Sequence, residues 1–144
     1  MGAQPQYSMA LSDAARAFLA EKRFAVLATI SEDGLPHQTV MWYELRGDDI
    51  IMNTAAGRVK DIHMRREMRV SICVEDQYRY VTISGAVELT DDQTVAQDDI
   101  RRLAIRYDGE EAGERQAREA FSKQHRVTLR LPIRQVIEHG LDEA

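Results

Sequence analysis

Residues 24–54, FAVLATISEDGLPHQTVMWYELRGDDIIMNT, contain three apolar runs separated by two short segments of turn residues. The first run, residues 24–30, is continuous and short enough to be a strand that is covered on both faces. Asp33 and Gly34 lie between the first two runs, and glycine beside aspartate is typical of tight turns. Strands joined by tight turns pair in antiparallel fashion. The stretch therefore predicts an antiparallel set of three strands, over residues 24–30, 37–45 and 50–54.

Three further strands are expected toward the C-terminus. Residues 70–74 form a short apolar run, and residues 78–89 alternate between apolar and polar side chains, which indicates one core face and one polar face. Residues 126–133 alternate in the same way, and residues 135–137 add a short piece. A sheet of six long antiparallel strands closes into a small barrel, because closure removes its unpaired edges. We therefore predict a mainly β protein, an antiparallel six-stranded barrel with peripheral helices.

Helical patterns flank and interrupt these strands. Ser12 is expected to cap a helix that runs to about Lys22. A capping box of Thr90 and Gln93 predicts the start of another helix, which ends near residues 108–109. Residues 110–123 are mostly charged and are expected to form a helix that covers the surface, with a role that the sequence does not assign. Residues 1–11 are interpreted as a disordered lead-in, so that one folded domain occupies residues 12–144.

Composition limits the class of protein further. The chain has 144 residues and a formal net charge of -5, which is unlike the extended basic surface of proteins that bind nucleic acid. No apolar stretch approaches the roughly 20 residues that cross a bilayer. The N-terminus lacks the basic start and apolar block of a signal peptide. A cytoplasmic protein without nucleic-acid or membrane partners is expected, and its single cysteine, Cys73, is interpreted as a small buried side chain.

Residues 58–69 concentrate positive charge in this acidic chain, because they hold five cations and two anions. They follow an apolar strand and a loop, so the free N–H groups of the first helical turn are expected to lie beyond the strand end, where a phosphate fits. Arg58 can add a two-pronged contact, Lys60 a point charge, and Thr54 a hydroxyl donor. The alternative is a solvated basic helix face, and the spacing alone leaves both interpretations open.

Two groups of motifs carry a resemblance to a known family. Asp33-Gly34-Leu35-Pro36 follows the first strand, and Arg58-Val59-Lys60 and Arg65-Arg66 follow the third. In their order and spacing the chain resembles the pyridoxamine-phosphate-oxidase-like, FMN-binding split barrels, and it is most similar to their subgroup of F420-dependent (deazaflavin) reductases. The resemblance implies a split-barrel cofactor-binding domain over residues 12–144. It also implies a homodimer that holds two flavin-like cofactors in the grooves between its subunits.

The resemblance places the phosphate site of the family on Thr54, Arg58 and Lys60, which the charge pattern selects independently. It implies that the strand after Pro36 contacts the pyrimidine edge of the cofactor, mainly through backbone groups. The residues of that strand are His37, Thr39 and Val40.

Three further positions follow from the resemblance. Val59 would pack near the cofactor chain, and Tyr78 or Tyr80 would shape the site. Ordinary cross-strand packing is the alternative explanation of the two tyrosines, and it is the simpler one. No catalytic side chain is expected, because the chain shows no carboxylate pair, Ser-His-Asp set or Cys-His pair at a suggestive spacing.

The implied activity is that of an oxidoreductase. The protein would bind reduced coenzyme F420 and pass its hydride to a small conjugated acceptor such as a quinone, an enone or a tetrapyrrole. FMN is the alternative cofactor, since one phosphate site serves either molecule. A second alternative is a non-catalytic haem or flavin carrier, in which a histidine ligates iron. The candidate histidines are His37, His63, His125 and His139, and no paired His/Cys spacing predicts another metal site.

Overall fold

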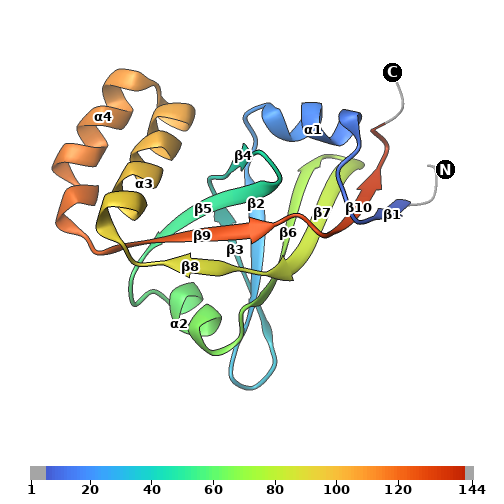
Figure 1. Ribbon diagram of the computed structural model, residues 1–144, viewed down its shortest axis with the longest axis horizontal. Coiled ribbons are helices and arrows are strands. Elements are labelled where there is room, and N and C mark those ends of the chain that lie inside the picture. The colour runs from blue at the N-terminus through green and yellow to red at the C-terminus, as the bar shows by residue number, and fades with distance from the viewer. Residues whose placement is uncertain (1–5, 142–144) are drawn as a thin grey trace.

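The structure is a computed structural model that describes residues 6–141 (Figure 1). Two antiparallel sheets form the body, one of six strands in the order β1-β10-β7-β6-β2-β3 and one of four in the order β4-β5-β9-β8. The strands are β1 Gln6–Ser8, β2 Ala25–Ile30, β3 Pro36–Met41, β4 Glu44–Arg46, β5 Asp49–Ala55, β6 Arg69–Asp76, β7 Arg79–Ala86, β8 Glu88–Thr90, β9 Arg126–Pro132 and β10 Gln135–His139. The helices are α1 Asp13–Ala20, α2 Val59–Arg66, α3 Gln93–Asp108 and α4 Glu110–Glu119, followed by a 3-10 turn at Phe121–Lys123.

The barrel is split because two of the predicted strands pass from one sheet to the other. The strand expected over residues 37–45 breaks between β3 and β4, and the strand expected over residues 78–89 breaks between β7 and β8. With each of these pairs counted as one, the six long strands are those that the sequence predicts. The prediction of a mainly β, antiparallel barrel with peripheral helices is confirmed, whereas the two break points were not predicted.

Tyr43 explains the first break. Its backbone N–H donates to the hydroxyl of Tyr107 on α3 at 3.1 Å, and not to a neighbouring strand. Its own hydroxyl donates to the carbonyl oxygen of Leu19 at the end of α1, at 2.9 Å. The side chain is fully buried, and this burial raises the pKa of the Tyr43 hydroxyl to about 12. The chain leaves the first sheet here because α1 and α3 supply the partners that a strand ladder would otherwise provide.

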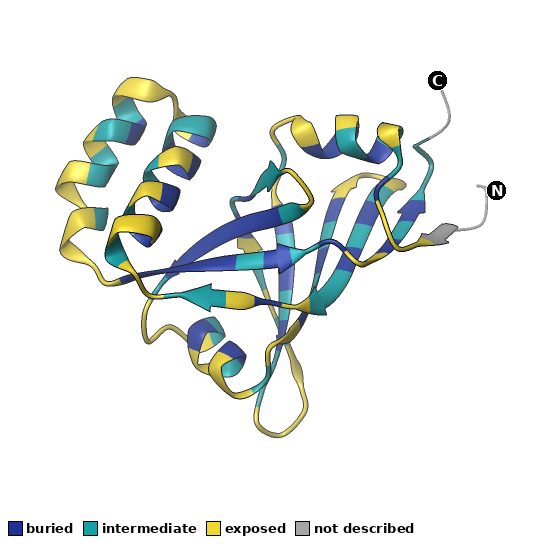
Figure 2. Cartoon of the chain, viewed as in Figure 1, coloured by how far each residue is buried: buried dark blue, intermediate teal, exposed yellow. Residues whose placement is uncertain are grey.

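One apolar core fills the space between the sheets (Figure 2). It is built from the alternating inward side chains of the strands, such as Leu27, Ile72 and Leu129, and from Met64 of α2. Phe18 of α1 belongs to the same cluster, so α1 covers one end of the barrel. Figure 2 shows β5 and β9 largely buried, which agrees with their position between other strands and beneath α3.

The predicted start of α1 is confirmed, since the Ser12 hydroxyl accepts from the N–H of Ala15 at 3.0 Å. The start of the lead-in, residues 1–5, lies outside the described residues. Residues 6–8, which were expected to be disordered, form β1 and pair with β10. Disorder is therefore the wrong prediction for these three residues, because the open edge of β10 supplies backbone partners for them.

The predicted capping box at α3 is wrong. The cap is Asp92, whose carboxylate accepts from the N–H of Thr94 at 2.9 Å. Gln93 instead bonds the backbone of Arg126, accepting from its N–H at 3.0 Å and donating to its carbonyl oxygen at 2.8 Å. The helix expected over residues 110–123 ends at Glu119 and is followed by the 3-10 turn.

Helices α3 and α4 form a hairpin that projects from the barrel on the left of Figure 1. They approach closely at Gly113, where a Cβ atom would lie 2.5 Å from the backbone nitrogen of Ile105. A second, smaller apolar cluster lies beneath α3 and is made of Ile100, Leu103 and Tyr107 with Trp42 and Phe121 packed against it. Within residues 6–141 there is no helix of the length and apolar character that a membrane span needs.

Candidate functional site

A cavity of about 250 Å³ opens where the edge of the barrel meets α3. Strands β3 and β5, the start of α2, helix α3 and the segment that leads into β9 all contribute to it. Its polar lining consists of Asn53, Thr54, Arg58, Lys60 and Arg126. Its apolar lining consists of Val40, Met41, Trp42, Ile100, Leu103 and Phe121. One side of the cavity is therefore cationic and the other is apolar.

Arg58, Lys60 and Arg126, which we call the cation cluster, form no ion pair within residues 6–141. Arg126 is only 4% exposed, and this burial, together with repulsion from Arg58, lowers the pKa of its guanidinium to about 10. Burial also lowers the pKa of the Lys60 ammonium, and the charges of Arg58 and Arg126 lower it further. Three cations that share a cavity without a carboxylate favour the binding of an anion.

The other three cations of residues 58–69 are engaged elsewhere. Arg65 pairs with Asp61, one turn earlier in α2, at 3.0 Å. Arg69 pairs with Glu67 at 2.5 Å, and Arg66 donates to a backbone carbonyl at the end of β2. Asp61 does not line the cavity, but its Oδ2 accepts from the N–H of Gly57 in the loop before α2 at 2.8 Å, so that N–H is already occupied. The structure thus separates the basic segment into two cations that face the cavity and three that do not.

The start of α2 offers further donors beside the cation cluster. Arg58 occupies the N-cap position, and no side chain caps the helix there. The first N–H groups of any helix lack intrahelical acceptors. The hydroxyl of Thr54 is buried, and within the described residues its oxygen has no hydrogen-bond partner. The hydroxyl proton is therefore available to an oxygen of a bound anion, which fits a phosphate at this position.

Asn53 fixes the side chain of Arg126 in the cavity. Its Oδ1 accepts from Arg126 Nε at 2.9 Å, and its Nδ2 donates to the carbonyl oxygen of Ala96 at 2.9 Å and to Thr128 Oγ1 at 3.3 Å. Asn53 is 7% exposed, so these bonds are shielded from water. A buried and satisfied amide of this kind holds its partner in one orientation.

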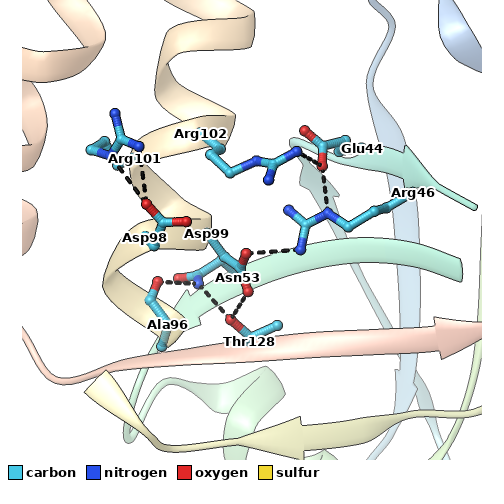
Figure 3. A network of polar contacts seen from close by, with 9 residues as sticks. All are labelled: Glu44, Arg46, Asn53, Ala96, Asp98, Asp99, Arg101, Arg102 and Thr128. Atoms are coloured by element: carbon cyan, nitrogen blue, oxygen red, sulfur yellow. Dashed lines mark hydrogen bonds and ion pairs between the residues drawn. The ribbon is translucent and has the colours of Figure 1, made fainter. Parts of the chain in front are cut away.

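The contacts of Asn53 continue into a network that locks α3 onto the barrel (Figure 3). Thr128 Oγ1 donates to Asp99 Oδ2 at 2.8 Å, and Asp99 Oδ1 accepts from Arg46 of β4 at 3.0 Å. Glu44 then accepts from both Arg46 and Arg102, at 2.8 and 3.1 Å. The network joins β4, β5, β9 and α3, so the two sides of the cavity keep a fixed separation.

The apolar side of the cavity is also held in place. Trp42 stacks on Tyr107 with ring centroids 5.3 Å apart and an angle of 8° between the planes. Phe121 is held by its backbone carbonyl, which accepts from the Gln97 side chain at 2.9 Å. The guanidinium of Arg126 lies 5.0 Å from the centroid of the Phe121 ring. Arg126 therefore stands at the boundary between the cationic and the apolar side.

Four of the residues expected from the sequence line this cavity together, and these are Val40, Thr54, Arg58 and Lys60. On β3, His37 lies three residues and Thr39 one residue before Val40, so their side chains point to the opposite face of the strand from that of Val40. The ring of His37 lies 5.4 Å from that of His63, and the Thr39 hydroxyl is buried without a partner among the described residues.

Strand β3 is an edge strand, because within residues 6–141 it pairs only with β2. Half of the backbone N–H and C=O groups of an edge strand point away from its partner. The backbone groups of successive residues point to opposite sides, so the contacts to a bound ring that the family resemblance implies can come from residues 37 and 39 or from residue 40, but not from all three. These contacts stay a prediction.

Val59, Tyr78 and Tyr80 do not line the cavity. Val59 is 52% exposed in the first turn of α2, beside the two cations. Tyr78 is 86% exposed, and Tyr80 stacks on His139 with centroids 5.2 Å apart. Both tyrosines belong to the end of the sheet near β10, since β6 and β2 lie between β7 and β3. Within one chain they are remote from the cation cluster, so their expected role stays a prediction.

Sequence reasoning missed several cavity residues, above all Arg126. A cation at the start of a strand gives no local signal, because 73 residues separate Arg126 from Asn53. Trp42, Ile100, Leu103 and Phe121 carry no local signal of a site either, because apolar residues in strands and helices are typical of a core. No group of three or more His, Cys, Asp or Glu residues within the described chain could hold a metal ion.

Comparison with known proteins supports the fold. Residues 11–139 match the model of the pyridoxamine 5'-phosphate oxidase family. The structure of the conserved hypothetical protein Rv2991 from Mycobacterium tuberculosis is 27% identical, with a TM-score of 0.77 over 95% of this chain and 90% of that one. A structure described as an F420 reductase is 22% identical, with a TM-score of 0.70 over 88% of this chain and 98% of that one.

A third similar structure is that of HutZ, the haem storage protein from Vibrio cholerae. It is 16% identical, with a TM-score of 0.69 over 92% of this chain and 97% of that one. No curated protein matches the chain by sequence. The family match covers most of the chain and agrees with the split barrel. The protein therefore belongs to the pyridoxamine 5'-phosphate oxidase family of split barrels.

Proposed function

We propose that the protein is an oxidoreductase that binds a flavin-like cofactor, with coenzyme F420 as the first candidate, and transfers a hydride to a small conjugated acceptor. Quinones, enones and tetrapyrroles are the acceptor classes to test. The observation that carries the proposal is the cation cluster, which has no acidic partner within the described chain and lies beside an edge strand. The similarity to an F420 reductase is one of fold, and it supports F420 only as a candidate.

The residues of the cavity have separate roles in this proposal. Arg58 and Lys60 bind the phosphate together with the first N–H groups of α2, and the Thr54 hydroxyl donates to it. Arg126 adds a third cation, whose orientation Asn53 fixes. Each of these contacts is made in a partly dry pocket, where a charge-assisted hydrogen bond is stronger than it is in water.

The edge of β3 orients the cofactor ring through its free backbone groups. When bound, the cofactor supplies the hydride chemistry, and the protein contributes orientation and the exclusion of water. No side chain of the chain is assigned as a proton donor, so solvent supplies the proton that the product needs. In this proposal the site has to position the cofactor ring and bind its phosphate with cations, and it does not need a catalytic dyad.

We further propose a homodimer formed through the outer face of the six-stranded sheet. Strand register places one row of uncharged side chains across five neighbouring strands, namely Val40, Val26, Cys73, Thr82 and Ile137. A second uncharged row lies beside it, made of Gln38, Ala28, Ser71, Ser84 and Gln135. A surface without charged side chains in these two rows suits an interface between two copies.

Val40 connects this face to the cavity. It is 68% exposed, belongs to the first row and also lines the cavity. A second copy on this face would therefore reach the open side of the cavity and shield a bound cofactor from water. The proposed dimer and the proposed cofactor site are thus parts of one arrangement.

FMN is the second candidate cofactor, and one observation favours it. Its phosphate is a monoester that carries a charge of about -1.5 to -2 at pH 7. The cation cluster has three positive groups, which match a dianion better than the single charge of a simple phosphodiester. A haem or flavin carrier without turnover is a further outcome that the following experiment distinguishes.

The test is to mix the purified protein separately with F420, FMN and haemin, and to record the absorption spectrum after gel filtration. We expect F420 to elute with the protein, and we expect the double variant Arg58→Ala/Lys60→Ala to lose it. Reduced cofactor is then mixed with a panel of quinones and enones and its oxidation is followed. Retention of FMN and not of F420 would make FMN the cofactor in place of F420. Retention of haemin alone, unaffected by the double variant, would refute the oxidoreductase proposal.

A further inference from the structure

The two parts of the proposed cofactor site belong to different elements of the fold. Arg58 and Lys60 lie at the start of α2, whereas the free backbone groups for the cofactor ring lie along the edge of β3. A ligand that makes two separate contacts gains most in affinity when the distance between those contacts is held fixed. The way in which α2 is attached to the β2–β3 pair therefore affects how tightly one molecule can bind to both.

His63 of α2 makes this attachment. It follows Lys60 by three residues, so the two side chains lie on neighbouring positions of one helix face. Its Nδ1 lies 2.9 Å from the Oγ1 of Thr29 on β2 and forms a hydrogen bond with it. Its ring lies edge-to-face with the ring of His37 on β3, with centroids 5.4 Å apart and an interplanar angle of 88°. One side chain of α2 therefore contacts both strands of the pair.

Strand register explains why both partners lie within reach of His63. Thr29 and His37 are directly opposite each other in the β2–β3 pair, so their side chains project to the same face of the sheet. Thr29 is fully buried, which shows that this face is directed toward the core. Met64, the residue after His63, belongs to the same core. The sheet thus presents to α2 two polar side chains at a fixed separation.

The hydrogen bond of Thr29 is one that the fold keeps. Thr29 is 0% exposed, and within residues 6–141 its hydroxyl has no other hydrogen-bond partner than His63. A buried hydroxyl is costly to leave unpaired, so this bond resists displacement of α2 along β2. Arg66 anchors the end of the helix, because its guanidinium donates to the carbonyl oxygen of Ile30 at 2.5 Å. His63 lies between that anchor and the cation cluster.

We propose that His63 is a positioning residue, which fixes the distance between the phosphate contacts at the start of α2 and the ring contacts along β3. Neither His63 nor Thr29 lines the cavity, so their effect on a ligand passes through the elements that they join. The inference rests on the proposed function, because it requires one ligand that contacts both elements. It assigns to a polar contact beneath the site a role in affinity and in the orientation of the ring.

The experiment compares a probe for one part of the site with probes for both parts. Sulfate carries the charge of a phosphate and no ring, so it reports on the cation cluster alone, whereas FMN and F420 carry both a phosphate and a ring. Thr29→Val keeps the shape of the side chain and removes its hydroxyl. Isothermal titration should show the tighter of the two cofactors weakened about tenfold and sulfate changed by less than about twofold, since only the linked contacts depend on their separation.

Further variants separate positioning from a loss of stability. Thr29→Ser keeps the hydroxyl and should restore the cofactor affinity to within about twofold of the wild type. His63→Phe keeps a ring beside His37 and removes the hydrogen bond, so it should repeat the effect of Thr29→Val and serves if thermal melting shows that Thr29→Val does not fold. Ile62→Ala is the control, because Ile62 lies on the outward face of the same helix and is 60% exposed. It should change neither affinity.

The orientation of the ring gives an independent measurement. At saturating cofactor, the visible circular dichroism of the bound ring should be weaker in Thr29→Val and in His63→Phe than in Thr29→Ser and the wild type. A ring that is held in several orientations gives a smaller averaged signal, whereas a change in stability alone leaves the signal of the folded complex unaltered.

Two results would overturn the inference and leave the proposed function intact. One is a wild-type cofactor affinity in both Thr29→Val and His63→Phe, and the other is an equal loss of sulfate and cofactor affinity with an unchanged dichroism signal. Binding of sulfate without binding of FMN or F420 by the wild-type chain would instead refute the proposed function, and with it the inference.

Discussion

Arg126 Nε donates to Asn53 Oδ1 at 2.9 Å, although 73 residues separate the two in the chain. The pair lies on adjacent strands, since Asn53 belongs to β5 and Arg126 opens β9. Asn53 in turn bonds α3 and Thr128, so the orientation of Arg126 depends on three elements. This bond adds a third cation to the two that α2 supplies.

Replacing Arg126 with methionine, Arg126→Met, is expected to weaken cofactor binding about tenfold or more, because a charge-assisted hydrogen bond contributes about 1.5 to 3 kcal/mol. Loss of the guanidinium relieves repulsion with Arg58 but leaves the buried Oδ1 of Asn53 without its donor, so we expect a folded variant that is less stable by about 1 to 3 kcal/mol. Titration measures the affinity and thermal melting checks the fold. Arg130→Met is the control, because Arg130 lies on the same strand as Arg126 and makes partly exposed ion pairs with Asp49 of β5 and Glu88 of β8. Equal affinities of the two variants would remove Arg126 from the site.

Removal of either cation of α2 is expected to reduce affinity. Arg58→Ala and Lys60→Ala should each weaken cofactor binding by about 1 to 3 kcal/mol, the range for hydrogen bonds to charged groups. Arg69→Ala changes the charge of the chain by the same amount, but Arg69 is exposed and pairs with Glu67. Its titration curve should match that of the wild type. If the curves of both α2 variants also match, the phosphate does not bind at the start of α2.

The affinity for an anion is expected to fall as the pH rises through about 10. Burial lowers the pKa of Arg126 to about 10, below its value in the unfolded chain. The charged guanidinium therefore destabilises the fold at pH values below about 10. This destabilisation is lost as the pH rises above 10 and the folded protein releases the proton. A bound anion favours the charged guanidinium and raises that pKa. Binding is therefore strongest below about pH 9, and Lys60, whose pKa is also lowered, acts in the same direction.

Sulfate is a suitable probe because its own charge does not change over this range. The increase in melting temperature that sulfate produces should be larger at pH 8 than at pH 10.5. The Arg126→Met variant provides the baseline for general salt effects and should show a smaller difference between the two pH values. An increase in the wild type that is independent of pH would contradict the assignment of these cations to the site.

The proposed dimer face can be disrupted within its first uncharged row. Thr82 lies in the first uncharged row, between Cys73 and Ile137. Thr82→Arg is expected to convert a dimer into a monomer, because two like charges would be buried close to each other in a symmetric interface. Sedimentation velocity measures the change in mass. Thr94→Arg makes the same substitution on the exposed surface of α3 and should leave the mass unchanged. A wild-type chain that sediments as a monomer would refute the interface outright.

Gly113 is expected to be essential for the packing of α4 on α3. Glycine to alanine usually stabilises a helix by about 1 kcal/mol. At Gly113 the added Cβ would lie 2.5 Å from the backbone nitrogen of Ile105, so the two helices must separate. Gly113→Ala should therefore lower the free energy of unfolding by about 1 to 3 kcal/mol, measured by urea denaturation. Glu111→Ala, at an exposed position of the same helix, is the control, and a stabilised Gly113→Ala would disprove the close contact.

Much of the barrel follows from local signals in the sequence. Alternation of side chains located β7 and β9, and glycine beside aspartate marked the turn before β3 and the turn before β5. Ser12 was identified as the cap of α1 from its residue type and the helical pattern that follows it. These features were predictable because each depends on residues that are neighbours in the chain.

The cap of α3 shows where such signals fail. Thr90, Asp92 and Gln93 are all plausible residues for the start of a helix, and pattern alone selected the wrong pair. The side chain of Gln93 does not cap the helix, because it forms hydrogen bonds to the backbone of Arg126, 33 residues later in the chain. The strand breaks at Trp42 and Val87 were missed for the same reason, because they depend on which sheet each segment joins.

The sequence by itself determined the order of strands and helices, the family and the concentration of charge after β5, because these follow from residue type and spacing. Only the tertiary structure decided which charges are available. It pairs Arg65 and Arg69 with carboxylates, leaves Arg58 and Lys60 facing the cavity, and brings Arg126 to join them. The physical reason is that an ion pair forms or fails according to distance in space, and strand pairing sets that distance across many residues of chain.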